Sequence, residues 1–229
     1  MREVLVGSTG FVGSNLLQEH AFDGCYHSSN IKDAYGAKPE LLVYAGVPSE
    51  MFTANQNPTQ DAARIEQAKK NIDQIEPEMV VLISTVAVYD DAKLVNEDSK
   101  SDTTKMTAYG RNRYELECWV EENFSKHLIV RLPAIYGVHL KKNFIYDYIH
   151  RIPALLKYDK FFELSSKESL LLDCYTDRGD GFYYCKELSK QEEQSLKNIF
   201  IKLGFTALSF TDSRSVYQFY PLRRLWSDI

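Results

Sequence analysis

Three glycines near the N-terminus have the spacing and the neighbours of a phosphate-binding turn. Gly7, Gly10 and Gly13 follow an apolar run and precede an apolar helical pattern. Gly7 permits a tight turn after a strand, Gly10 lets the backbone approach phosphates, and Gly13 allows helix and strand to pack closely. The N–H groups and the positive dipole end of the helix would then face the anion. The segment predicts a site for the pyrophosphate of a dinucleotide, and a plain glycine turn is the alternative.

A second group of residues could transfer a proton. Thr85 ends an apolar run, and at the carboxyl end of a strand its hydroxyl can donate to a substrate oxygen. Tyr109 and Arg113 are four residues apart, so on a helix they share one face. A free phenol has a pKa of about 10, and a fixed cation beside it favours the phenolate. A turn hydroxyl and a surface Tyr–Arg stack are the alternatives without function.

Strand-like and helical patterns alternate through the first 140 residues, and the elements they predict would position these residues. This alternation predicts an α/β fold with a doubly wound parallel sheet, and the helices should pack on that sheet. The expected strands are residues 3–6, 25–28, 41–45, 79–84 and 128–132, and the expected helices are 11–19, 61–75 and 108–123.

The pattern changes after residue 137. An aromatic-rich amphipathic helix is expected at 143–156, then a polar stretch with turns at Gly179 and Gly181, a charged helix near 190–203 and a strand at 215–220. The segment 158–208 fits either a source of substrate contacts or a solvated helical hairpin. We therefore predict a dinucleotide-binding domain over 1–137 and a smaller, variable substrate-side lobe over 138–229, packed on the same domain.

Composition excludes several classes of function. Lys and Arg number 27 against 32 Asp and Glu, so the formal charge is −5, and no dense basic run suggests a nucleic-acid partner. No apolar run reaches 18 residues and no signal peptide is apparent, so we expect a soluble cytoplasmic protein without a membrane partner. The four cysteines and five histidines show no ligand spacing, which argues against a metal site and a disulfide framework.

Four segments, in order, resemble motifs of the extended short-chain dehydrogenase/reductase family. The glycine segment resembles that family's glycine motif, residues 83–89 resemble I-S-T/S-x-x-V-Y, residues 109–113 resemble Y-G-x-x-K, and residues 131–137 resemble R-x-x-x-x-Y-G. A looser match covers residues 216–222 with Leu225 and Ile229. The resemblance covers the first 137 residues well and the remainder patchily.

The resemblance implies a Rossmann-type domain, bound NADP or NAD, and hydride transfer on a nucleotide sugar by an oxidoreductase or epimerase. Tyr109 would be the general acid/base, Thr85 would orient the substrate oxygen, and Arg113 would replace the lysine that contacts the nicotinamide ribose. Pro133 either ends a strand or packs on the nicotinamide. The expected cofactor contacts are Gly7, Thr9, Gly10, Phe11, Val12, Gly13, Ser28, Ser29, Asn30, Ala45, Gly46, Ser84 and Pro133.

Two absences narrow the reaction. Dehydratases of the family carry Asp-Glu directly after the threonine, whereas Val86 and Ala87 stand here, so dehydration is disfavoured. After the second strand, residues 28–30 and Lys32 provide hydroxyl, amide and ammonium groups that suit a 2′-phosphate. We therefore favour NADP over NAD, although Asp33 could reach an unphosphorylated ribose.

Departures from the family pattern support other functions. Arginine at position 113 supplies the lysine's charge with a different geometry and cannot join a proton relay. The sequence also stops soon after the fifth match, so the lobe is reduced or the chain is a piece of a longer one. The alternatives are a non-catalytic dinucleotide-binding sensor or interaction protein, and an idle subunit of a polysaccharide-assembly complex. A homodimer is a further option.

Overall fold

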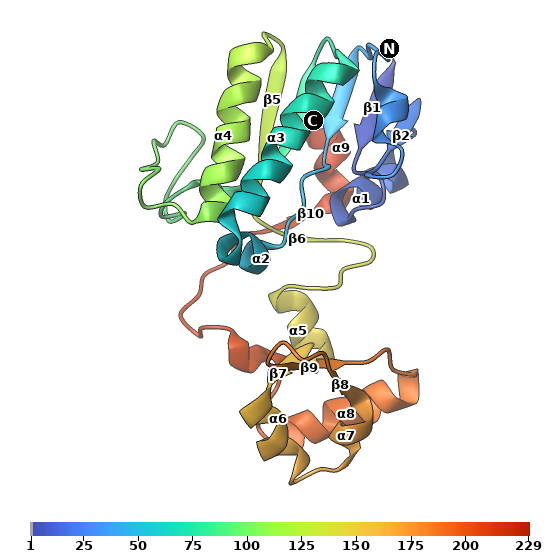
Figure 1. Cartoon of the computed structure of the whole chain (residues 1–229), viewed down its shortest axis with the longest axis vertical. Coiled ribbons are helices and arrows are strands. Elements are labelled where there is room, and N and C mark those ends of the chain that lie inside the picture. The colour runs from blue at the N-terminus through green and yellow to red at the C-terminus, as the bar shows by residue number, and fades with distance from the viewer. Residues whose placement is uncertain (1) are drawn as a thin grey trace. The chain divides into compact units, whose positions relative to one another are not determined.

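The computed structural model describes residues 2–229, which divide into two compact units (Figure 1). The first unit comprises the described residues up to His139 together with Tyr217–Ile229. The second unit is Leu140–Val216. The five strands of the parallel sheet and the glycine turn belong to the first unit.

The sheet of the first unit is parallel throughout, in the order β2-β1-β3-β4-β5. Residues 4–6 of β1 and the whole of β3 are buried, as expected for parallel strands covered on both faces. The predicted α/β, doubly wound Rossmann-type sheet is confirmed, and the expected strands differ from the observed ones by at most two residues at either end. The strands are β1 (Glu3–Val6), β2 (Gly24–Tyr26), β3 (Leu41–Tyr44), β4 (Val80–Thr85) and β5 (His127–Leu132).

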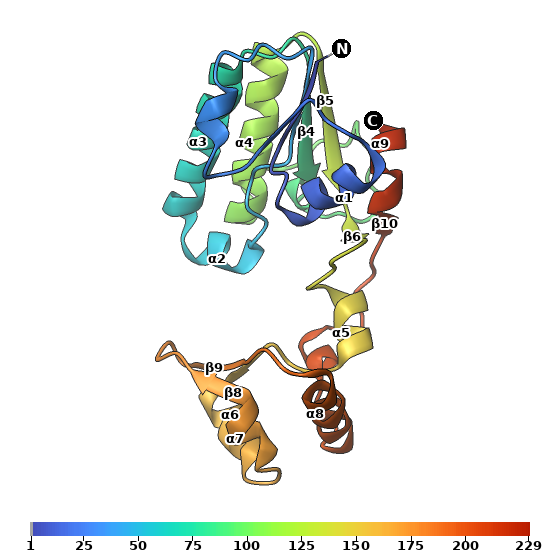
Figure 2. The same cartoon turned by 90° about the vertical axis from the view of Figure 1, so that its right-hand side faces the viewer.

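Helices cover both faces of this sheet (Figure 2). Helices α3 (Pro58–Ile75) and α4 (Ala108–Asn123) lie on one face, and α1 (Phe11–Glu19) and α9 (Leu225–Asp228) lie on the other. The buried apolar positions of α3 are 65, 68, 72 and 75, which form one stripe at helical spacing. A short helix, α2 (Met51–Gln56), precedes α3.

The C-terminal segment returns to the first unit, which differs from the expected division at residue 137. Strand β10 (Phe219–Pro221) pairs in parallel with β6 (Ala134–Tyr136). Leu222 and Leu225 are fully buried in the same core as Leu16 of α1. Burial of these apolar side chains assigns Tyr217–Ile229 to the first unit rather than to the second one.

The second unit has its own sheet and core. Strands β7 (Leu155–Lys157), β9 (Phe182–Cys185) and β8 (Tyr175–Asp177) form an antiparallel sheet in that order. Phe161 and Phe200 are buried in its core. The solvated helical hairpin, one of two interpretations of this segment, is therefore wrong, because the segment buries aromatic side chains against a sheet. The helices are α5 (Phe144–His150), α6 (Tyr158–Ser165), α7 (Leu170–Cys174) and α8 (Lys190–Lys202).

The helix expected over 143–156 is too long. Helix α5 ends at His150, and Arg151 follows with φ of +67°. Pro153 then follows, and a proline disfavours the helical conformation of the residue before it, so the chain turns toward β7 instead. Among residues 2–229, no helix is both long enough and apolar enough to cross a lipid bilayer.

Candidate active site

Two of the three glycines of the turn are required by packing. The N–H of Gly7 donates to the carbonyl oxygen of Tyr26 at 2.8 Å, and Gly7 has φ of +92°. A Cβ on Gly7 would lie 2.3 Å from the carbonyl oxygen of Ala45, and one on Gly13 would lie 2.2 Å from the carbonyl oxygen of Gly7. A Cβ on Gly10 would meet only the Gly7 carbonyl oxygen, at 3.2 Å. The exposed side of Gly10 is therefore open to a ligand.

The N-terminus of α1 points its unpaired N–H groups toward this opening. Gly10 is its N-cap, no side chain caps the helix, and its first turn holds no acidic residue. Thr9 and Gly10 are exposed, while Phe11 and Val12 are half-buried. Free helical N–H groups beside an open glycine backbone fit a pyrophosphate, so the residues present suit the dinucleotide that the sequence predicts.

Other expected cofactor contacts lie at the same edge of the sheet. Parallel strands bring their carboxyl ends together, and the loops after β2, β3 and β5 all begin there. In the loop after β2, the Asn30 side chain accepts from the His27 N–H at 2.7 Å, and the Ser29 hydroxyl lies 3.1 Å from the His27 ring. These loops carry the predicted contacts Ser28, Ser29, Asn30, Ala45, Gly46 and Pro133.

The side chain of Ser84 faces inward. Its hydroxyl donates to the buried carboxylate of Glu117, which also accepts from Arg131 at 2.8 Å. Arg131 donates to the hydroxyl of Tyr89 at 2.9 Å. Burial raises the pKa of Glu117, and its bonds with Arg131 and Ser84 oppose that rise. Glu117 of α4 therefore joins β4 to β5 through its bonds with Ser84 and Arg131, and the hydroxyl of Ser84 is used in that network.

Thr85 and Tyr109 are brought together by the way α4 begins. The side chain of Thr107 accepts from the Gly110 N–H at 3.2 Å, which caps the helix. A Cβ on Gly110 would lie only 2.0 Å from the carbonyl oxygen of Ala87, so the first turn of α4 packs directly on the segment after β4. This contact places the Tyr109 phenol within hydrogen-bonding reach of the Thr85 hydroxyl; burial raises the pKa of the phenol, and the bond with Thr85 opposes part of that rise.

Arg113 and Tyr109 share a face of α4, as the spacing predicts. The guanidinium carbon lies 3.8 Å from the centre of the Tyr109 ring, and both side chains are buried. Burial raises the pKa of Tyr109 above its ordinary value, while the Arg113 charge opposes that rise. Arg113 is ion-paired with Asp61 and donates to the carbonyl oxygen of Pro48 at 2.7 Å. Both terminal nitrogens of the guanidinium thus donate to protein groups.

Asp61 was not predicted as a site residue, although its position on α3 indicated an unusual role. Asp61 lies four residues before Ile65 and shares the buried stripe of α3, where an acidic residue is out of place. Asn112 also donates to its carboxylate, at 2.8 Å.

Asn15 was also missed. Its amide donates to the Val138 carbonyl oxygen and accepts from the Val138 N–H, both at 2.9 Å. A Cβ on Gly137 would lie 2.3 Å from the Asn15 amide oxygen, so this contact explains the glycine that ends the R-x-x-x-x-Y-G segment.

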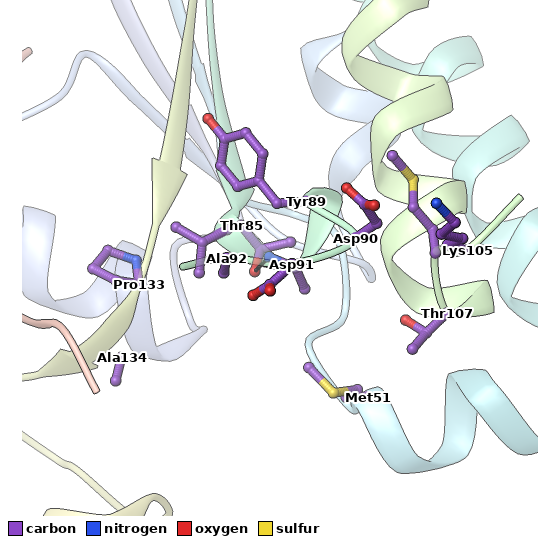
Figure 3. A pocket seen from close by; sticks show the side chains of 13 residues that line it. Met51, Thr85, Tyr89, Asp90, Asp91, Ala92, Lys105, Thr107, Pro133 and Ala134 are labelled. Carbon is purple, nitrogen blue, oxygen red and sulfur yellow. Dashed lines mark hydrogen bonds between the residues drawn. The ribbon is translucent and has the colours of Figure 1, made fainter. Parts of the chain in front are cut away.

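A cavity of about 490 Å³ adjoins Thr85 (Figure 3). In that view Thr85 lies between Pro133, which follows β5, and Met51 of α2. The volume is typical of a small-molecule site. The lining residues are Met51, Thr85, Val86, Ala87, Tyr89, Asp90, Asp91, Ala92, Lys105, Met106, Thr107, Pro133 and Ala134.

Comparison with known proteins identifies the family of the chain. The model of the family described as "RmlD substrate binding domain" matches residues 1–153. The chain belongs to this family. That membership and the parallel sheet also confirm the resemblance to the extended short-chain dehydrogenase/reductases. A search of curated proteins found no match.

Solved structures share the fold at low identity. The dTDP-4-dehydrorhamnose reductase of Yersinia enterocolitica matches with a TM-score of 0.55 and 19% identity. The match covers 66% of this chain and 60% of the reductase. The dTDP-4-dehydrorhamnose reductase of Bacillus anthracis, in complex with NADP, matches with a TM-score of 0.54 and 16% identity. The match covers 96% of this chain and 83% of that reductase. A UDP-galactose 4-epimerase matches with a TM-score of 0.51 and 22% identity, and the match covers 65% of this chain and 61% of the epimerase. The chain therefore spans about three-fifths of the length of two of these relatives.

Proposed function

We propose that the chain is an NAD(P)-dependent oxidoreductase or epimerase whose substrate is a nucleotide sugar. The observation that carries the proposal is that the open turn at Gly10, after β1, and the Thr85–Tyr109 pair, at the end of β4, lie at the same carboxyl edge of one parallel sheet. Solved relatives with the same fold support it, since one of the reductases is in complex with NADP. A bound nicotinamide dinucleotide supplies or accepts the hydride in such chemistry.

Each part of the site has a proposed role. The Gly10 backbone and the first N–H groups of α1 hold the pyrophosphate. Ser28, Ser29 and Asn30 lie where the adenosine ribose is expected, and with the exposed Lys32 they favour the 2′-phosphate of NADP.

The proton chemistry belongs to Thr85 and Tyr109. The Thr85 hydroxyl orients the substrate oxygen, and the Tyr109 phenol holds the proton that this oxygen receives when a carbonyl is reduced. Burial keeps that phenol protonated, because it raises the pKa of Tyr109. A protonated phenol is the state required of a general acid when a carbonyl is reduced.

Binding and turnover are tested separately. Thermal unfolding and calorimetric titration with NADPH and NADH should show saturable stabilisation, stronger with NADPH, because a ligand held only by the native state raises its stability. Absence of heat and of stabilisation with both dinucleotides would refute the proposal. Turnover is then followed by the absorbance of the reduced nicotinamide with a panel of 4-keto nucleotide sugars.

The second candidate function is a dinucleotide-binding sensor without turnover. The observation that favours it is that Arg113, which stands at the position of the family's lysine, binds Asp61 and the carbonyl oxygen of Pro48 instead of taking over that lysine's role. Tight NADPH binding, combined with no oxidation or reduction across the substrate panel, would select the sensor.

A further inference from the structure

We propose that Asp61 and Arg113 form one buried clamp that sets the position of the Tyr109 ring, and that Arg113 is a positioning residue, not a ligand of the cofactor. The catalytic consequence of this clamp rests on the proposed function. The clamp itself does not, because it is defined by contacts within the protein.

The hydrogen bonds of Arg113 already bind protein groups. One terminal nitrogen of the guanidinium binds the Asp61 carboxylate and the Tyr109 carbonyl oxygen, the latter at 3.2 Å. The other donates to the carbonyl oxygen of Pro48 at 2.7 Å. One face of the guanidinium lies over the Tyr109 ring, and Arg113 is only 5% exposed. Little of its surface remains for a ribose.

The carboxylate of Asp61 is buried in the core. Asp61 is 2% exposed and occupies a position in the buried stripe of α3 that an apolar residue would otherwise fill. One carboxylate oxygen binds Arg113 and Asn112, and the other is buried without a hydrogen-bond partner among the described residues. A half-satisfied buried carboxylate is costly unless a cation neutralises it, so Asp61 and Arg113 depend on each other.

The clamp also accounts for arginine where the family pattern has lysine. A planar guanidinium can stack on a tyrosine ring while its edge binds a carboxylate and two carbonyl oxygens. A lysine ammonium is a compact charge without that flat face. Arg113 therefore ties the Pro48 loop, α3 and α4 together at the base of the Tyr109 side chain.

The first test is a double-mutant cycle on thermal stability. Arg113→Met leaves the Asp61 charge buried and unpaired, so Tm should fall by about 10 °C. The double variant Asp61→Leu with Arg113→Met replaces the pair by apolar groups and should recover most of that loss. The matched control is Lys69→Met, which breaks the Lys69–Glu115 ion pair between the same two helices and should shift Tm by about 2 °C or less. A double variant no more stable than Arg113→Met would overturn the clamp.

The second test separates positioning from cofactor binding. The double variant should keep its NADPH affinity within about twofold, whereas its kcat should fall about tenfold with the KM for NADPH unchanged, because the ring is misplaced. A tenfold loss of NADPH affinity in this variant, at wild-type Tm, would make Arg113 a cofactor ligand and overturn the proposal. If the wild type binds no dinucleotide, the proposed function fails, and the stability cycle alone decides the clamp.

Discussion

Gly10 and Gly13 offer a matched pair of substitutions that separates cofactor binding from packing. In Gly13→Ala the new methyl would sit 2.2 Å from the Gly7 carbonyl oxygen, so α1 and the turn must move apart by about 1 Å. Overpacking of this kind costs about 1–3 kcal/mol, which for a chain of this size lowers Tm by about 3–10 °C.

In Gly10→Ala the closest atom is 3.2 Å away, and φ of −75° suits any residue. The main cost is a poorer N-cap, about 1 kcal/mol. The added methyl projects into the space proposed for the pyrophosphate, so NADPH affinity should fall about tenfold or more while Tm changes by only about 3 °C.

The assay measures Tm by calorimetry and NADPH affinity by titration for both variants and the wild type. Retained affinity in Gly10→Ala would show that phosphates do not approach this residue. An unchanged Tm in Gly13→Ala would refute the packing argument for the third glycine.

Further predictions concern the proton donor and its buried neighbours. Tyr109→Phe should reduce turnover by about a hundredfold or more with NADPH affinity nearly unchanged, and an unaffected rate would place the acid elsewhere. Because burial raises the pKa of Tyr109 above its ordinary value of about 10, the phenol stays protonated at lower pH and ionises only as pH rises through the raised value. The reductive rate should therefore show no loss from this ionisation up to about pH 9, measured across buffers of constant ionic strength, and a decline near neutral pH in wild type that is absent in Tyr109→Phe would contradict this. Glu117→Ala should lower the free energy of unfolding by about 3 kcal/mol because it strands the Arg131 charge, whereas Glu115→Ala, on the exposed part of the same helix, should cost under about 1 kcal/mol in denaturant titration.

Local patterns in the sequence predicted the elements of the first unit closely. The ranges of α1 and α4 were predicted to the residue, because apolar periodicity and the glycine spacing are properties of short segments. The glycine spacing likewise indicated the turn, and the carboxyl edge of a parallel sheet placed Thr85 beside the expected site.

Contacts between distant segments could not be read in the same way. Asp61 and Arg113 come from different helices, and nothing local to either residue names its partner. Contacts between distant segments also decide three other features. The hydroxyl of Ser84 bonds to Glu117, residues Tyr217–Ile229 pack in the first unit, and Leu140–Val216 form a separate core. Periodicity in the sequence indicates that a side chain is buried, but only the packed structure decides which residues contact it. Secondary-structure propensity depends on a few neighbouring residues, whereas the contacts of a buried side chain depend on the whole chain. For this protein that difference decides the role of Arg113, which the sequence presents as a substitute for lysine and the structure holds as half of a buried ion pair beneath the Tyr109 ring.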